Sequence, residues 1–227
     1  MAIRIGVTWS PAKRSHRIKH LAMNVYVESN FVLEQALEQE QCESCQRLIE
    51  IAAAGSIRLV IPAFSLAEPY ITLMHKANER SRLSTELQKQ LSELGRSKSY
   101  REASSSFNEI TALLIRSAES ERAGLERAMD GILKAADVIP LDSDVFYQAG
   151  GIQTALDMSV QDSIVLASVV RHLAGTKPAE SCFLNRNTRD FDDPNVRGML
   201  EDFGCRFFGR FDHALQYVEG HLRKATD

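Results

Sequence analysis

The feature that most constrains this chain is a junction at residues 24–30, where a short apolar strand pattern meets a carboxylate and then a helix. The strand pattern is Asn24-Val-Tyr-Val, Glu28 follows it directly, and apolar residues at helical spacing begin at Phe31. In open α/β sheets, ligands bind just outside the carboxyl ends of the strands. An acid at this position therefore stands at the mouth of a binding site, and we place the candidate active site here.

The alternation of strand and helix continues along the chain. Ile57-Arg-Leu-Val-Ile61 is a continuous apolar run of the kind that is buried on both faces of a parallel sheet. Further strands are predicted at residues 138–141, 181–184 and 205–208, with helices between them at residues 31–39, 42–54, 65–74, 142–156, 159–173, 196–203 and 212–222. This order predicts a three-layer α/β fold with a mainly parallel central sheet flanked by helices.

Residues 77–137 have a different character from the rest. This segment is long and rich in charged residues, it has leucines at helical spacing, such as Leu83 and Leu87, and it shows no strand pattern. We predict a helical arm or hairpin inserted between sheet elements, with a joint at residues 95–101. That joint carries Arg96, Lys98 and Arg101 beside Tyr100, a combination that could contact an RNA backbone and stack on a base. The alternative interpretation is a solvated loop.

Length and composition indicate one soluble domain. A chain of 227 residues with 44% hydrophobic and 25% charged residues can bury a substantial core. No apolar run approaches the length needed to cross a bilayer, so we expect no membrane contact. We assign residues 23–222 to a single domain that includes the insertion at 77–137, and residues 223–227 to a tail.

The first 22 residues are basic and form a separate segment. They contain five Lys or Arg and no acid, and they lack the apolar core of a secretory signal. Because those five charges belong to a formal net charge of −3, the remainder carries −8. We expect a disordered extension, with a nucleic-acid-binding arm or a transit segment as the alternatives.

The four cysteines favour a reducing compartment. Cys42 and Cys45 have the spacing of half a zinc site, but Cys182 and Cys205 do not form a second close pair. Cys45 falls in register with the apolar stripe of its helix, so buried free thiols are the favoured interpretation over metal binding. Without a secretion signal, this pattern predicts a cytoplasmic protein.

Four acids lie at strand ends or helix starts: Glu28, Glu68, Asp162 and Asp190. Each also has an ordinary structural interpretation. Ser65-x-x-Glu68 fits a capping box, Ser159-x-x-Asp162 fits an acidic variant of it, and the other two could be loop acids.

A metal site explains the four acids together. If the sheet is parallel, their junctions open on the same edge, where four carboxylates would repel one another and raise each other's pKa. A divalent cation relieves that repulsion, and oxygen-only ligands favour a hard ion, Mg²⁺ or Mn²⁺. Such a site activates water and stabilises charge on a phosphoryl group, which suits phosphodiester hydrolysis.

Four motifs in order resemble those of the PIN-domain family, the nuclease fold shared by VapC-type ribonuclease toxins. They are Tyr26-Val-Glu-Ser-Asn-Phe-Val32, Leu59-Val-Ile-Pro-x-x-Ser-Leu-Ala-Glu68, Gln161-Asp-Ser-Ile-Val-Leu-Ala167 and Phe183-Leu-Asn-Arg-Asn-Thr-Arg-Asp-Phe191. They cover roughly residues 23–75 and 138–210, and together they are more specific than any one alone.

The resemblance implies roles for particular residues. Glu28, Glu68, Asp162 and Asp190 would be the catalytic, metal-binding acids, with Asn187 as an alternative fourth ligand and Asn30 ordering the first loop. It also implies RNA as substrate, with an antitoxin or other protein partner and a homodimer as further expectations. The first acid departs from the family, which usually has Asp where this chain has Glu28.

Two functional hypotheses follow. The first is a divalent-metal-dependent endoribonuclease, of the VapC toxin type. The second is a catalytically weak PIN scaffold that binds RNA or a protein through the arm, because the extra methylene of Glu28 displaces the carboxylate and errors of about 1 Å cost some 10²-fold in rate. A small-molecule phosphatase has less support, since the chain has no Walker loop and no Gly-x-Gly-x-x-Gly. No Gly-x-Ser-x-Gly elbow for Ser-His-Asp catalysis is present either.

Overall fold

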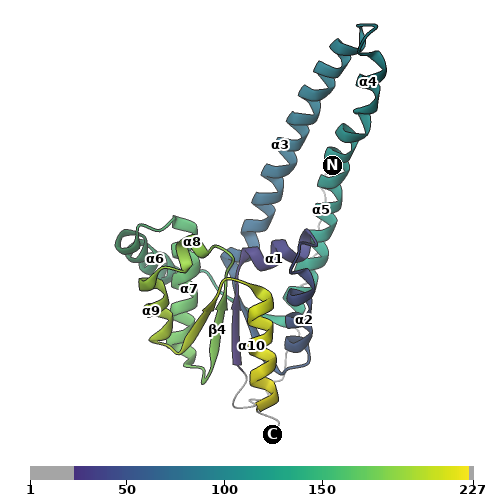
Figure 1. Ribbon diagram of the computed structural model, residues 1–227. Helices are drawn as coiled ribbons and strands as arrows, with labels where there is room; N and C mark the ends of the chain where they lie inside the picture. Colours follow the sequence, from purple (N-terminus) through teal and green to yellow (C-terminus); the bar gives the residue numbers. More distant parts are fainter. Residues whose placement is uncertain (1–22, 225–227) are drawn as a thin grey trace, which may run out of the picture.

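The computed structural model describes residues 23–224, apart from the side chains at positions 103, 105, 106 and 108 (Figure 1). The basic segment 1–22 and residues 225–227 lie outside the described residues. Within the described part, no helix is long and apolar enough to span a bilayer.

A five-stranded parallel sheet forms the centre of the domain. Strand β1 (Met23–Val27) lies in the middle, and the strand order is β3-β2-β1-β4-β5. The other strands are β2 (Ile57–Pro62), β3 (Ala136–Ile139), β4 (Ser181–Leu184) and β5 (Cys205–Phe208). Every neighbouring pair is parallel. The predicted parallel α/β fold is therefore confirmed, and all carboxyl ends of the strands meet at one edge.

Alternation along the strands builds one core on each face of the sheet. Val25 and Val27 point to a core shared with α1 (Ser29–Ala36), α2 (Cys42–Ala53), the base of α5 (Asn108–Ala135) and α10 (Phe211–Lys224). Tyr26 and Phe183 point to the opposite core, which α7 (Val160–Thr176) and α9 (Pro194–Glu201) cover. Helix α6 (Ser143–Leu156) packs on α7, and α8 (Thr188–Phe191) is a single turn. The layers are visible in Figure 1.

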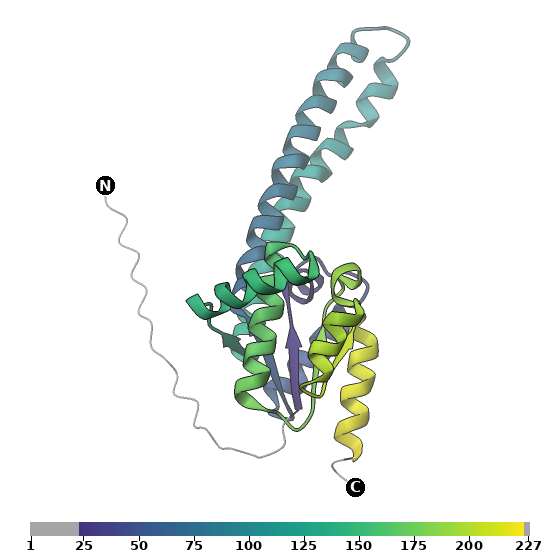
Figure 2. The same ribbon diagram turned by 90° about the vertical axis from the view of Figure 1, so that its left-hand side faces the viewer.

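Residues 63–135 form a helical hairpin that projects from the carboxyl edge of the sheet (Figures 1 and 2). It consists of α3 (Ala63–Gly95), the short α4 (Arg101–Ser106) at the tip and the returning α5. Arg80 and Glu121 form an ion pair of 2.7 Å between the two long helices, and the Ser84 hydroxyl donates to the Thr111 carbonyl. The arm is thus a direct extension of α3 and not a separate element that starts at residue 77.

Several boundaries differ from the sequence-based predictions. Strand β3 begins at Ala136 and not at 138, because Ala136 pairs with Leu59 in the parallel ladder. The final helix extends from Phe211 to Lys224, so the first two residues of the predicted tail are helical. All four cysteines are free, and Cys45, Cys182 and Cys205 are buried, as the interpretation of buried thiols predicts.

Candidate active site

A cavity of about 380 Å³ lies at the carboxyl edge of the sheet, beside the base of the arm. Three of the four predicted acids line it: Glu28 after β1, Glu68 from α3 and Asp162 from the start of α7. Asn187, from the loop after β4, lines the same cavity. The remaining lining residues are Ser29, Asn30, Leu33, Thr72, Ser159, Gln161 and Val165. Parallel strands bring these distant segments together because their carboxyl ends share one edge.

Glu28 is the most buried of these acids, with 3% of its surface exposed. It is the N-cap of α1, and its Oε2 accepts hydrogen bonds from the Ser29 hydroxyl (2.8 Å) and the Asn30 backbone N–H (3.0 Å). Its Oε1 is buried and has no hydrogen-bond partner among the described residues. Burial raises the pKa of Glu28 to about 7, against the lowering effect of these hydrogen bonds, and the charge of Glu68 adds to the rise.

Glu68 lies in the second turn of α3 and is not part of a capping box. The helix begins at Ala63, with Pro62 as its N-cap, so Ser65 is already inside the helix. The Ser65 hydroxyl is buried without a hydrogen-bond partner in the described chain. The capping interpretation of Glu68 is therefore wrong. The same helical face presents Glu68 and, one turn later, Thr72 to the cavity.

Asp162 has the predicted capping role, and its second carboxylate oxygen contacts Asn187. The Ser159 hydroxyl accepts from the Asp162 backbone N–H (3.1 Å) and donates to Asp162 Oδ2 (2.6 Å), which is the predicted cap of α7. Asp162 Oδ1 instead accepts a hydrogen bond of 3.3 Å from the Asn187 side chain. The cap holds the carboxylate in one orientation while its second oxygen faces Asn187.

Asn187 and Asp190 occupy different places. The Asn187 amide also donates to Asp190 Oδ2 (2.9 Å), so it links Asp162 and Asp190. Asp190 itself lies on α8 and lines a separate cavity of about 80 Å³ with Met158 and Arg189. Of the two candidates for the fourth ligand, Asn187 is the one that faces the Glu28 cavity, and Asp190 holds the Asn187 side chain.

The sequence analysis did not identify Asn185, which connects the two loops of the site. Its side chain is buried, and Oδ1 accepts hydrogen bonds from the Asn187 backbone N–H (2.8 Å) and from the Asn30 side chain (3.4 Å). This contact joins Asn30, at the start of α1, to the loop after β4. Next to it, Arg186 forms an ion pair with the fully buried Glu34 of α1. Their position directly after β4 is the signal that could have identified them.

The donor set fits a hard divalent cation. In residues 23–224, no three His, Cys, Asp or Glu side chains are placed to hold one ion as they stand. Mg²⁺ is commonly held by only one or two carboxylates together with water and substrate phosphate, so a preassembled cage is not required. The buried, unpartnered Glu28 Oε1 is the observation that favours a cation here, because a cation would replace its missing partner. Glu28, Glu68 and Asp162, with the Asn187 carbonyl, are the residues that would hold it.

The structure does not bring the predicted RNA-binding residues to this cavity. Arg96, Lys98, Tyr100 and Arg101 are all exposed and lie at the tip of the arm. From Glu68 to Gly95, α3 rises about 40 Å at 1.5 Å per residue. Any contact between these residues and RNA would therefore be a second contact, remote from the acids.

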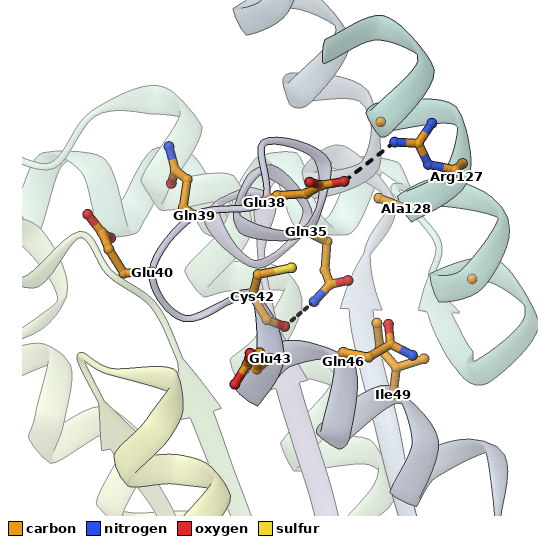
Figure 3. A pocket seen from close by; sticks show the side chains of 12 residues that line it. Gln35, Glu38, Gln39, Glu40, Cys42, Glu43, Gln46, Ile49, Arg127 and Ala128 are labelled. Atoms are coloured by element: carbon orange, nitrogen blue, oxygen red, sulfur yellow. Dashed lines mark hydrogen bonds and ion pairs between the residues drawn. The ribbon is translucent and has the colours of Figure 1, made fainter. Parts of the chain in front are cut away.

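A larger cavity, of about 520 Å³, lies between the α1–α2 turn and α5 (Figure 3). Gln35 donates a hydrogen bond to the Cys42 carbonyl, and Glu38 pairs with Arg127 at 3.6 Å across it. None of the four predicted acids lines this cavity. It lacks the buried unpartnered carboxylate of the smaller cavity, and we do not assign the active site to it.

A family model described as PIN domain matches residues 25–191, about three quarters of the chain, and that range includes the three cavity acids, Asn187 and Asp190. No curated protein matches the chain.

Proposed function

The chain belongs to the PIN-domain family, and from this membership we propose that it is a divalent-metal-dependent endoribonuclease that hydrolyses RNA phosphodiester bonds. PIN domains are generally nucleases, which supports hydrolase activity in broad terms. The observation that carries the specific proposal is the buried Glu28 carboxylate, with one oxygen unpartnered, in a cavity that it shares with Glu68 and Asp162.

The residues that line the cavity would have different roles in the reaction. Glu28, Glu68 and Asp162 would hold Mg²⁺ or Mn²⁺, and the Asn187 side chain would help. When bound, such an ion stabilises the charge that develops on the phosphoryl group and favours ionisation of the attacking water. Ser159 keeps Asp162 in one orientation through two hydrogen bonds, so its carboxylate is positioned before substrate arrives.

RNA as substrate and a toxin role are the finer parts of the proposal. The four motifs resemble those of VapC-type ribonuclease toxins, which supports RNA over other phosphodiesters. The same resemblance supports an antitoxin as the protein partner, and the four free cysteines favour the cytoplasm as the location. Co-purification with the product of a neighbouring reading frame that suppresses cleavage would support the toxin assignment, whereas a nuclease without such a partner would limit the proposal to RNA cleavage.

The test is cleavage of a labelled single-stranded RNA in Mn²⁺, Mg²⁺ or EDTA, by the wild type and by Asp162→Asn. We expect cleavage only with metal, and a loss of at least about 100-fold in the variant, because an amide carries no charge for the ion. Asp130→Asn, an exposed position on α5, is the matched control and should cleave normally. Undiminished cleavage by a folded Asp162→Asn protein would contradict the assignment.

A second candidate function is a catalytically weak scaffold that binds RNA through the arm. It is favoured by Glu28 standing where the family usually has Asp, and by the exposed cations and Tyr100 at the tip. Binding of the same RNA without turnover would support it. Glu28→Asp then distinguishes the two, since a large gain in cleavage would show a site weakened by the longer side chain, and a loss would show a site built for Glu.

A further inference from the structure

The outer part of the arm has almost no core of its own. Among the described side chains of residues 77–120, only Ser84 and Thr111 are buried, and both are polar. In contrast, ten of the sixteen exposed large hydrophobic residues in the described chain lie at residues 70–115. Both views show that no helix or strand of residues 23–224 outside the hairpin covers this part of it (Figures 1 and 2). Exposed apolar side chains gathered on one projecting element favour an interaction site.

One side of the hairpin carries four of these ten residues, Leu83, Leu94, Phe107 and Ile110. Ser84 and Thr111 face each other between the helices, and each is preceded by an exposed apolar residue, Leu83 (51% exposed) and Ile110 (46%). One residue corresponds to a rotation of about 100° around a helix. Because α3 and α5 run in opposite directions, the same step back along the chain carries both side chains to the same side of the hairpin.

On α3, a row of uncharged residues continues along this side. Leu83, Leu87, Gln90 and Leu94 follow at intervals of four, three and four. This is the spacing at which one helix packs along another. Leu94, the last residue of this row, is 47% exposed.

A matching row lies on α5 and at its start. Phe107, Ile110, Leu114 and Ser117 follow at intervals of three, four and three. Phe107 is 48% exposed, and Ser117 accepts a hydrogen bond from Arg80 on the other helix. We call the two rows together the distal seam. None of its eight positions carries a charge, and two uncharged rows on neighbouring helices are typical of helices that pack in a bundle.

We propose that the distal seam packs against the distal seam of a second copy of this chain, so that two hairpins form a four-helix bundle. An uncharged seam offers nothing to the phosphates of a nucleic acid, which require cations. Residues 77–135 contain ten Lys or Arg and nine Asp or Glu, whereas residues 23–76 and 136–227 contain twelve and twenty-one. Two copies can therefore approach through their nearly neutral arms without the charge repulsion that the acidic remainder of each chain would cause. In a dimer with a two-fold axis, the same seam of each copy contacts the seam of the other.

The size of the seam predicts a weak dimer. Residues 80–95 of α3 span about 22 Å, and two adjacent helices are about 20 Å wide, which gives about 450 Å² on each copy. The total of about 900 Å² lies below the range of stable protein interfaces, so we expect a dissociation constant of micromolar order.

The test is sedimentation velocity of the full chain between about 1 and 100 µM. We expect the mass to rise from 25.4 kDa toward twice that value. Leu83→Glu with Ile110→Glu should keep the chain monomeric, because the carboxylates would be buried in the seam. Phe146→Glu with Tyr147→Glu, on α6 and similarly exposed, is the matched control and should dimerise like the wild type.

A variant that strengthens the dimer gives a second test, which does not depend on whether the double mutant folds. Gln90→Leu should tighten the dimer about tenfold, since a polar residue in a helical seam weakens association. Gln88→Leu, about 160° around the same helix, should not. The proposal is overturned if both the wild type and Gln90→Leu stay monomeric at 100 µM, if only the α6 pair dissociates the dimer, or if Gln88→Leu tightens it equally.

Discussion

In the absence of divalent ions, the stability of this protein should depend on pH through Glu28. The unfolded chain loses the Glu28 proton near its ordinary pKa of 4.5, whereas burial keeps it on the folded protein up to about pH 7. The contribution of Glu28 to stability is therefore fully present below pH 4.5 and is lost as the pH rises through 7. At about 1.4 kcal/mol per pH unit, the loss is about 3 kcal/mol.

Urea unfolding in EDTA at pH 5 and pH 8 measures this effect if the wild type is compared with Glu28→Gln. Glutamine keeps the shape of the side chain but cannot ionise. We expect Glu28→Gln to become the more stable protein as the pH rises, by about 2 to 3 kcal/mol between the two conditions. Glu119→Gln, which removes a negative charge from the exposed surface of the arm, is the matched control for loss of charge away from the cavity.

Two results would refute this reasoning. The first is a difference between Glu28→Gln and the wild type that stays constant from pH 5 to pH 8, which would show that Glu28 is not buried as the structure has it. The second concerns the metal. Mg²⁺ added at pH 8 should stabilise the wild type by binding only the folded state, and equal stabilisation of Glu28→Gln would place the ion elsewhere.

Three further substitutions test the packing of α5 and the cap of α7. Gly124→Ala should destabilise the fold by about 1 to 3 kcal/mol, since its Cβ would lie 2.1 Å from the Ala36 carbonyl oxygen; Gly131→Ala on the same helix meets no atom within 4 Å and should stabilise it by up to about 1 kcal/mol. Equal effects of the two in urea unfolding would contradict the close approach. Ser159→Ala should cost about 1 kcal/mol by removing the cap of α7 and should also lower cleavage, because Asp162 loses the partner that orients it. Cleavage at the wild-type rate would show that the cap has no part in positioning Asp162.

Much of the fold was accessible from local sequence patterns. The predicted strands lie within two residues of the observed ones, because apolar runs bounded by turn residues report directly on short buried strands. The capping box at Ser159 was also readable, since it depends on residues three apart. The similar pattern at Ser65 misled for the same reason. Nothing local shows that α3 begins at Ala63 and carries Ser65 into its interior.

By itself, then, the sequence determined the order of strands and helices, the PIN-like motifs and the acids within them. Only the tertiary structure decided which polar groups share the cavity, because Glu28, Glu68, Asp162 and Asn187 come from segments far apart in the chain. It also decided that Asp190 supports Asn187 instead of lining the same cavity. The raised pKa of Glu28 also depends on the tertiary structure. It is caused by the exclusion of water from the carboxylate, and that burial requires all these segments to pack together.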